Sequence, residues 1–548
     1  MINSRNRIVV AVSSGCDDET WSAGMLREAA AEAIAQGRES DARELLELAL
    51  RDQPDGPAAA ELADLAWWLD PPAGARTLTQ PARQTGLTGP AASVLARRLA
   101  WHGLADEAAA VLDAHPDTGI ERIVTGVWLS RLYPGSFTPS AGEPAADRIA
   151  ATHPWLRGTA TPDAVLQGLR LHRAALEPLV MSLLALENAQ ALDPDVPWFT
   201  DLIAAAGRSG SRLPEALLTA ARARAELRRG ALAEAAGSAE AALHAVGPAG
   251  WGVAVGLPLG TILEAFTAQG RHEEVADRLW TTVPRSLCRT PYGLIYLRGR
   301  GLHYLATGRE RAALSEFMAA GDVQAGWGVS YPGLSPWLLD AARAHLALGE
   351  PDQARALADR QIAAIGSDHP RVRAGALRVR AATLDPAYRP GPLREAISVF
   401  ERCGDRWELA HSLAELGQAF DDAGQPSYAH APRSRARSLA EECGAGPLSH
   451  VMAARGEAEE HRAGRSTASL RALSDAERRV AELAAQGYKN REIARRLFLT
   501  ASTIEQHLTR IYRKLGVCRR SGLVSVPGLV PQAGPGSAVS GRPPTRRP

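Results

Sequence analysis

The amino-acid sequence predicts an all-α protein, with a tetratricopeptide-like α-solenoid followed by a small C-terminal helix-turn-helix domain. Ala and Leu dominate the 548 residues, and aromatic residues make up 5 %, a mixture that favours helices over strands. A helix–Gly–helix pattern recurs roughly every 40 residues, which is typical of helical repeats. A basic segment near the C-terminus contains three closely spaced amphipathic helices. Each part is taken in chain order below.

Residues 21–132 are expected to form an N-terminal helical block, because apolar residues recur there at helical spacing with a break at Gly37. Residues 1–20 before this block are expected to be a flexible arm. The stretch that follows the block is rich in Pro, Gly, Ser and Thr. Residues 133–164 are therefore expected to be an irregular loop region.

The main repeat array is expected over residues 165–446. In each unit a first helix ends near Leu-x-x-Gly, a few polar or small residues follow, and an Ala opens the second helix. The turn glycines are Gly230, Gly270, Gly308, Gly349 and Gly424. The last interval is close to two periods, so the missing unit is expected to turn near Arg389–Pro392 and to begin its second helix at Leu393. Hairpins that bury one face need stacked neighbours, which favours a solenoid over the alternative, an irregular helical bundle.

Charge is unevenly distributed along the chain, although the formal net charge is only +1. From Arg471 to Arg520 there are 12 Lys or Arg against 5 Asp or Glu, a net charge of +7. The two lysines of the chain, Lys489 and Lys514, both lie in this segment. A basic end on an acidic body indicates a polyanionic partner for the end alone.

Several function classes are excluded by what the sequence lacks. The 5 Cys are scattered without a CxxC pattern, which argues against disulfides and a zinc site and favours a reducing cytoplasm. No membrane span or signal peptide is expected. The chain has no Gly-Lys dipeptide, so it has no G-x-x-x-x-G-K-[ST] phosphate loop, and no nucleotide hydrolysis is expected. The glycine cluster at Gly252–Gly260 is interpreted as an inter-helix turn. No cofactor, metal or catalytic centre is predicted, so the chain is not expected to be an enzyme.

Residues 470–526 are expected to hold three short helices. Ser474–Glu477 has the capping-box pattern at the start of the first helix. Asn490 is expected to cap the second helix and Thr500 the third, which should run over Ser502–Leu515. Two helices joined by a short turn describe a helix-turn-helix, whose last helix enters the major groove of DNA.

The third of these helices should bury Ile504, Leu508, Ile511 and Leu515 and expose a polar face. Candidate base-contacting residues are Glu505, which can accept from cytosine, Gln506, which can pair with adenine, and Thr509, which can touch a thymine methyl. The candidate phosphate-contacting residues are Lys489, Asn490, Arg495, Thr500, Ser502, Thr503, Arg510, Arg513 and Lys514. The alternative is a basic helical cap whose charges are merely solvated.

Residues 473–517 closely resemble the C-terminal DNA-binding domain of the LuxR family. The motifs that carry the resemblance are Gly487-x-x-Asn490-x-x-Ile493-Ala494, Thr503-Ile504-x-x-His507 and Leu515-Gly516-Val517. Two positions depart from the family pattern. Glu505 stands where many members place a base-contacting Lys, which changes the expected base preference. The fourth, dimer-forming helix is confined to Ser521–Val526 by Pro527, which puts dimerisation through that helix in doubt.

A helical-repeat body before such a domain resembles the C-terminal half of large ATP-binding LuxR-type (MalT-like) regulators, without their ATPase domain. The resemblance implies a sequence-specific transcriptional regulator with a signal- or partner-sensing body, located in the cytoplasm at the nucleoid. Its partners would be double-stranded DNA, a protein or small-molecule effector on the solenoid, RNA polymerase if it activates, and a second copy if it dimerises. The alternative is a protein-interaction scaffold with weak or lost DNA binding. Residues 447–469 are expected to be a linker and residues 527–548 a disordered tail.

Overall fold

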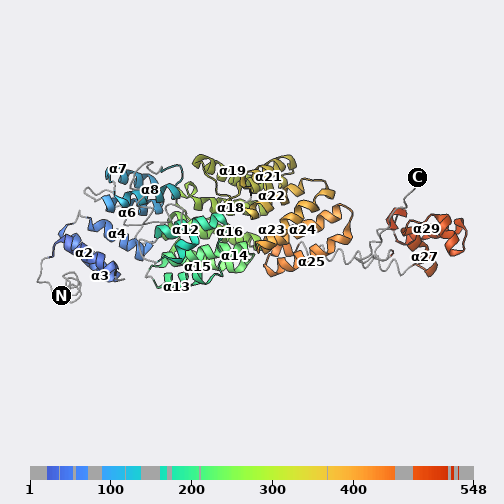
Figure 1. The fold of residues 1–548 in the computed structure, drawn as a ribbon, viewed down its shortest axis with the longest axis horizontal. Helices are drawn as coiled ribbons and strands as arrows, with labels where there is room; N and C mark the ends of the chain where they lie inside the picture. The colour runs from blue at the N-terminus through green and yellow to red at the C-terminus, as the bar shows by residue number, and fades with distance from the viewer. Residues whose placement is uncertain are drawn as a thin grey trace, which may run out of the picture. The chain divides into compact units, whose positions relative to one another are not determined.

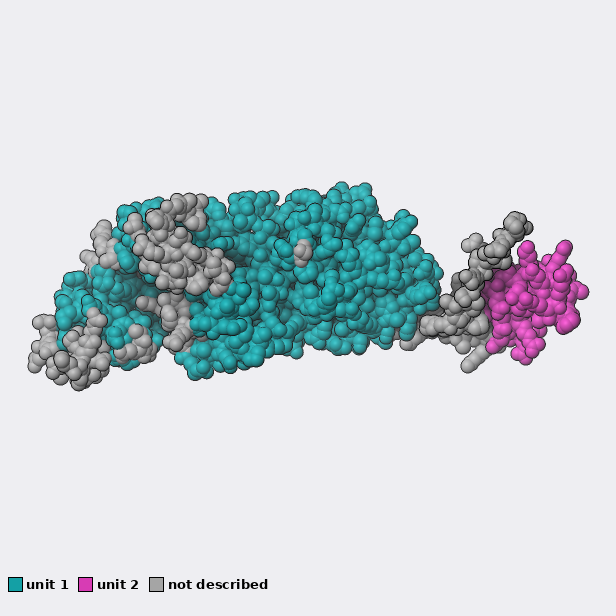
Figure 2. Space-filling view, viewed as in Figure 1, with its two compact units in different colours: residues 1–449 teal, residues 450–548 magenta. Residues whose placement is uncertain are grey.

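The structure is a computed structural model of the chain. It describes residues 21–35, 38–53, 57–71, 89–117, 119–137, 161–169, 176–208, 211–366, 368–450, 473–515, 517, 520–523 and 529. The predicted N-terminal arm and most of the predicted linker and tail lie outside these residues. Within them every regular element is helical, and the chain divides into two compact units, residues 1–449 and 450–548 (Figure 2).

In its described residues, the N-terminal block of unit 1 has six helices, drawn in blue in Figure 1. They are α2 (Ala23–Ala35), α3 (Glu39–Asp52), α4 (Ala58–Leu69), α6 (Gly89–Trp101), α7 (Ala105–Ala114) and α8 (Ile120–Leu132). Helix α2 packs against α3, α3 against α4, and α6 against both α7 and α8. Helix α4 also contacts α6 and so joins the first three helices to the rest of the block.

The predicted irregular region between block and array has ordered ends. At its start the Tyr133 side chain is fully buried, and its hydroxyl donates to the Ala100 carbonyl over 2.6 Å. At its end, helix α11 (Pro162–Gln167) begins before the predicted boundary at residue 164. Thr161 caps this helix by accepting from the Ala164 N–H, and Pro162 fits the first turn because that position needs no N–H partner. Residues 138–160 lie outside the described residues.

The main array runs from green to orange in Figure 1 and consists of antiparallel helix pairs. Its α-helices are α12 (Leu176–Ala189), α13 (Pro197–Gly207), α14 (Arg212–Arg228), α15 (Leu232–Trp251), α16 (Gly256–Gln269), α17 (His272–Arg278), α18 (Pro291–Ala306), α19 (Glu310–Trp327), α20 (Trp337–Ala347), α21 (Pro351–Ile365), α22 (Pro370–Ala382), α23 (Pro390–Arg402), α24 (Arg406–Asp422) and α25 (Pro426–Glu442). Three 3-10 helices accompany them where the array is described, η3 (Gly252–Val255), η4 (Leu287–Arg289) and η5 (Pro386–Tyr388). Helices α14, α16, α18, α20 and α22 also contact one another in succession, which makes the array a tetratricopeptide-like α-solenoid.

The turn glycines lie where the sequence predicts them. Gly230, Gly270, Gly308, Gly349 and Gly424 all have positive φ, between 69° and 81°. This left-handed conformation reverses the chain after the first helix of each pair, and glycine adopts it without steric cost. The missing unit is formed by α22 and α23. Its second helix begins at Pro390, three residues before the predicted Leu393, because proline is favoured in the first helical turn.

The glycine cluster from Gly252 to Gly260 is only partly the predicted inter-helix turn. Gly252 has a φ of 53°, and a Cβ there would lie 2.1 Å from the Trp101 carbonyl oxygen, so the array meets the N-terminal block at this point. Gly256 and Gly260 lie inside α16, where a Cβ would lie 2.2 Å from the Tyr292 carbonyl oxygen and 2.7 Å from Ile295, respectively. Both glycines let α16 pack closely against α18.

One stretch of the described residues, Leu232–Gln269, is long and apolar enough to cross a membrane by length and composition. The sequence analysis did not identify it. Its most apolar window is 83 % buried inside the solenoid, and Gly247 and Pro248 interrupt the helical backbone. The stretch therefore forms the core of the array.

Charged side chains of alternating sign follow one another through the first helices of successive pairs. We call this set the charge ladder, and it consists of Glu187, Arg224, Glu264, Arg298 and Asp340. Arg224 and Arg298 each donate to Glu264 over 2.6 Å, and Arg298 also pairs with Asp340 over 2.7 Å. Glu187 lies 3.7 Å from Arg224. The side chains are between 0 and 16 % exposed, so the ladder joins neighbouring units in a low-dielectric interior.

Candidate nucleic-acid interface

The described residues of unit 2 form three α-helices and a short 3-10 helix, drawn in red in Figure 1. They are α27 (Asp475–Ala485), α28 (Asn490–Leu497), α29 (Ala501–Leu515) and η6 (Arg520–Leu523). Val480, Ile493, Ile504 and Ile511 are fully buried at the centre of their shared core, and Leu523 of η6 closes it. This core fixes the direction of each helix and so decides which side chains face outward.

The predicted capping box at the start of α27 is present. Ser474 Oγ accepts from the Glu477 N–H, and Glu477 Oε2 accepts from the Ser474 N–H over 2.8 Å. The same Glu477 oxygen accepts from Lys514 Nζ over 2.6 Å, and this hydrogen bond lowers the pKa of Glu477. Lys514 therefore ties the end of α29 to the start of α27, a role that the sequence did not reveal.

Helix α28 begins differently from the prediction. Lys489, and not Asn490, is the residue before the helix, and its N–H donates to Glu492 Oε2 over 2.7 Å. Asn490 Oδ1 instead accepts from Arg520 Nη1 over 2.7 Å, and Arg520 also donates to the Tyr488 carbonyl. The Asn490 amide oxygen, which the sequence analysis expected to cap the helix, is thus bonded to the Arg520 guanidinium.

A tight turn joins α28 to α29. Phe498 has a φ of 55°, a left-handed conformation that ends α28, and its side chain is 95 % exposed. The Leu499 N–H then donates to the Ala494 carbonyl over 2.9 Å. Thr500 caps α29 as predicted, because its Oγ1 accepts from the Thr503 N–H over 3.2 Å.

Helix α29 separates an apolar face from a polar face as the sequence predicts. Ile504, Leu508 and Ile511 are at most 4 % exposed, whereas the three candidate base-contacting residues Glu505, Gln506 and Thr509 are exposed. Leu515, the last residue of the predicted buried stripe, is only half-buried, at the end of the helix. The helix begins at Ala501, one residue earlier than expected. The Thr509 hydroxyl donates to the Glu505 carbonyl over 2.9 Å, so its proton is used within the helix.

The candidate phosphate-contacting residues also lie at the surface. Asn490 and Thr503 are half-buried, and the exposed ones are Lys489, Arg495, Thr500, Ser502, Arg510, Arg513 and Lys514. Among the described residues, no carboxylate lies within ion-pair distance of Arg495, Arg510 or Arg513. These three guanidinium groups are available to an external anion. A cation that the sequence analysis did not consider, Arg496, stacks on the Tyr488 ring with its Cζ 3.6 Å from the ring centroid.

The described part of the predicted fourth helix, Ser521–Val526, is a single turn. Arg520–Leu523 form the 3-10 helix η6, Leu523 is buried against the three-helix core, and residues 524–528 lie outside the described residues. No group of three or more His, Cys, Asp or Glu in the described parts of the chain could hold a metal ion.

Comparison with known proteins gives a family match for this domain. Residues 471–526 match the family described as "Bacterial regulatory proteins, luxR family". Proteins of Mycobacterium bovis and Mycobacterium tuberculosis, provisionally named as HTH-type transcriptional regulators, are each 40 % identical to this chain over 74 residues. The matched stretch spans 14 % of this chain and 8 % of each relative.

Solved structures similar to the chain are helical-repeat proteins that share little sequence with it. The Cut9–Hcn1 complex of APC/C aligns with 80 % of this chain and 91 % of its own, with 14 % identity and a TM-score of 0.34. Yeast Tom70 aligns with 80 % of this chain and 96 % of its own, with 11 % identity and a TM-score of 0.26. At such scores the solenoid assignment rests on the helix pairs themselves. The C-terminal domain, by contrast, belongs to the LuxR family of bacterial regulatory proteins, and this chain joins it to a tetratricopeptide-like helical body.

Proposed function

We propose that the chain is a sequence-specific DNA-binding transcriptional regulator whose helical-repeat body senses a signal or a partner. The observation that carries the proposal is the polarity of α29. Its aliphatic side holds the three-helix core, while Glu505, Gln506 and Thr509 point to solvent. A helix of this kind after a tight turn is the element that helix-turn-helix proteins place in the major groove.

The exposed face offers three different base contacts. Gln506 can donate to and accept from adenine, and Glu505 can accept from the cytosine amino group. Because the Thr509 hydroxyl proton is bonded to the Glu505 carbonyl, Thr509 is better suited to contact a thymine methyl than to donate to a base. A carboxylate at position 505 also repels nearby phosphates, so Glu505 is suited to a base contact and not to a backbone contact. Because it accepts from the cytosine amino group, the operator should favour cytosine where Glu505 reaches the base edge.

Phosphate contacts would position the domain without reading sequence. Arg495, Arg510 and Arg513 are the strongest candidates, since no described carboxylate neutralises them. Lys489, Thr500, Ser502 and Thr503 would add contacts at the starts of α28 and α29. Asn490 and Lys514 already have partners inside the domain, so we assign them mainly to holding the helices in place.

The remaining partners follow from the class of protein. A protein or small-molecule effector would bind the solenoid, RNA polymerase would be contacted if the regulator activates, and a second copy would pair two DNA half-sites. The regulator would act in the cytoplasm at the nucleoid. Its described fourth element is only the short η6, so dimerisation would need another surface.

The test is selection of binding sites from random duplex DNA by the full chain, followed by fluorescence anisotropy at several salt concentrations. We expect one enriched motif. The single variant Gln506→Ala should relax one base position, with a loss of about 1–3 kcal/mol for the preferred base. The double variant Arg510→Ala/Arg513→Ala should weaken binding to all sequences and reduce the salt slope by about 2.

The matched control for charge is Arg360→Ala/Arg437→Ala, two exposed arginines of unit 1. It should bind DNA as the unaltered chain does. Selection that enriches no motif, with weak binding that these substitutions leave unchanged, would reject the regulator proposal. That outcome would favour the scaffold alternative instead.

A further inference from the structure

A cavity of about 160 Å³ lies inside the solenoid, and the first helices α14, α16, α18, α20, α22 and α24 all contribute to its wall. The array curls far enough for the first and last of these helices to meet. Arg406 Nε, at the start of α24, donates to the Arg229 carbonyl at the end of α14 over 3.0 Å. A Cβ on Gly230 would lie 3.0 Å from the Trp407 nitrogen, so the two helix ends pack closely. The concave side, which solenoids commonly offer to extended partners, is narrowed here to a small internal space.

The size and the apolar wall of this solenoid cavity limit what it can hold. Its volume lies below the range of about 300–1,000 Å³ that drug-sized ligands occupy, so it suits a small molecule and not an extended peptide. The apolar side chains of the wall are Leu227, Ala268, Leu302, Leu339, Val372 and Phe400. A ligand therefore needs a short apolar part to pack against them.

Most charged groups on the wall are already paired. The N–O distances of these pairs are between 2.6 and 3.1 Å. The pairs are Arg224–Glu264, Arg298–Glu264, Arg228–Glu187 and Arg343–Glu408. These side chains neutralise one another and give a ligand no charge to bind.

Asp405 is an exception among the charged groups. Its side chain is buried, and its Oδ1 accepts from the Glu408 N–H over 3.1 Å and so caps α24. In the part of the chain that the structure describes, no basic side chain lies within ion-pair distance of its carboxylate, and no donor reaches its Oδ2. Burial and the neighbouring Glu408 charge raise the pKa of Asp405, and the Arg371 charge offsets only part of this effect. A positive group brought into the cavity would complete the balance.

Arg371 on α22 is the complementary exception. It is half-buried, and its Nη2 donates to the Cys403 carbonyl. No carboxylate of the described ranges lies within ion-pair distance of its guanidinium. Its remaining N–H groups can therefore donate to a carboxylate from outside the protein. The same small cavity thus holds one negative and one positive group without ion-pair partners.

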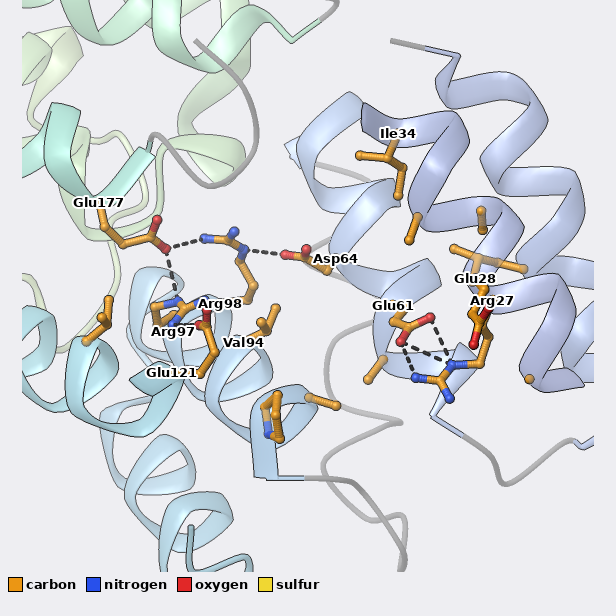
Figure 3. A pocket seen from close by; sticks show the side chains of 18 of the residues that line it. Arg27, Glu28, Ile34, Glu61, Asp64, Val94, Arg97, Arg98, Glu121 and Glu177 are labelled. Carbon is orange, nitrogen blue, oxygen red and sulfur yellow. Dashed lines mark hydrogen bonds and ion pairs between the residues drawn. The ribbon is translucent and has the colours of Figure 1, made fainter. Parts of the chain in front are cut away.

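The larger cavity at the N-terminal end of unit 1 differs in this respect (Figure 3). It has a volume of about 820 Å³, and each guanidinium of its described lining has a carboxylate partner. The pairs are Arg27–Glu61, Arg98–Asp64, Arg98–Glu177, Arg97–Glu177 and Arg97–Glu121. Charge therefore selects no ligand there.

We propose that the solenoid cavity binds a small zwitterion, an α-amino acid with a short apolar side chain. The ligand carboxylate accepts from Arg371, its ammonium donates to Asp405, and its side chain packs against the apolar wall. An anion without an ammonium leaves Asp405 unbalanced and is repelled by it. A cation without a carboxylate is repelled by Arg371. Binding does not depend on the DNA-binding activity, whereas the role of the amino acid as the signal for the regulator rests on the proposed function.

The test compares L-valine with two analogues that each lack one charged group. Isovalerate lacks the ammonium, and isobutylamine lacks the carboxylate. Isothermal titration calorimetry of the full chain at neutral pH gives the three dissociation constants, by displacement of L-valine where an analogue binds weakly. We expect L-valine to bind at least about tenfold more tightly than either analogue, because each loses one charge-assisted hydrogen bond.

Two variants separate the two ends of the ligand. Asp405→Asn keeps the shape and can still cap α24, and it should weaken L-valine and isobutylamine about tenfold without weakening isovalerate. Arg371→Gln should weaken L-valine and isovalerate about tenfold without weakening isobutylamine. A purely structural role would weaken all three ligands together. The matched controls are Asp352→Asn and Arg360→Gln, exposed residues of α21 outside the described lining, which should change none of the three.

Filling the cavity gives an independent readout. Ala268→Leu adds a larger side chain to the wall at α16 and should abolish L-valine binding. Its control is Ala347→Leu, at an exposed position of α20 outside the described lining. Far-ultraviolet circular dichroism of each variant checks that the helices remain folded.

The proposal is overturned if L-valine does not bind, if the three ligands bind equally, or if each variant weakens all of them alike. DNA binding measured on the same preparations separates this proposal from the proposed function. A chain that discriminates the three ligands but binds no DNA motif would keep the cavity and reject the regulator. A chain that binds its motif but does not discriminate the ligands would reject the cavity alone.

Discussion

The centre of the charge ladder offers a quantitative test of how the solenoid is held together. Glu264→Gln removes one negative charge with almost no change in shape. The carboxylate is 9 % exposed and lies 2.6 Å from both Arg224 and Arg298. Burial alone would raise the pKa of Glu264, but the two guanidinium charges outweigh it and hold the pKa below its usual value. The charged form is therefore the one that stabilises the fold.

The expected loss in the free energy of unfolding depends on which carboxylate partners Arg224 and Arg298 keep. Breaking a buried ion pair generally costs about 3–5 kcal/mol, because an uncompensated charge remains. After Glu264→Gln, Arg224 still has Glu187 and Arg298 still has Asp340. We therefore expect the lower end, a loss of about 3 kcal/mol in the free energy of unfolding of unit 1.

The matched control is Glu240→Gln. Glu240 also lies 2.6 Å from its partner, Arg278, but both side chains are between 36 and 39 % exposed. A solvated pair of this kind contributes about 0–1 kcal/mol. Urea unfolding followed by far-ultraviolet circular dichroism gives both values. Equal midpoint shifts for Glu264→Gln and Glu240→Gln would refute the reasoning that burial makes the ladder strong.

Three further predictions concern other parts of the fold. Ile504→Ala removes a fully buried side chain and should lower the stability of unit 2 by about 2–4 kcal/mol, measured by thermal unfolding; a loss below 1 kcal/mol would contradict its core position. Burial lowers the pKa of His411 to about 4, so the unfolded chain binds a proton there between pH 6.5 and 4 and the folded chain does not. The free energy of unfolding should therefore decrease as the pH is lowered from 6.5 to 4, by up to about 1.4 kcal/mol per pH unit. His411→Gln should make this measured slope shallower. Gly252→Ala should destabilise unit 1 much more than Gly349→Ala, because both have positive φ but only the first places a Cβ 2.1 Å from the Trp101 carbonyl oxygen; similar unfolding midpoints would show that the contact relaxes freely.

Features set by neighbouring residues could be predicted from the sequence. The turn glycines needed only the knowledge that a left-handed residue ends a helix. The capping box at Ser474–Glu477 and the apolar stripe of α29 each follow from spacings of three or four residues. The outward polarity of Glu505 and Gln506 follows in turn, because a buried stripe fixes the opposite face of its helix.

Features set by packing could not be predicted in this way. Lys514 meets Glu477 across 37 residues, and Arg520 meets Asn490 across 30. Each contact depends on how α29 and η6 lie against α27 and α28, which periodicity does not determine. The same limit explains why Asn490 was assigned a capping role that it does not have.

The charge ladder did leave a signal in the sequence. Glu264 pairs with Arg224 across 40 residues and with Arg298 across 34, and Arg298 pairs with Asp340 across 42. These intervals are close to the repeat period. Charged residues of alternating sign, recurring once per repeat on apolar first helices, therefore indicate ion pairs between neighbouring units. A search for apolar periodicity alone discards these positions as solvated charges.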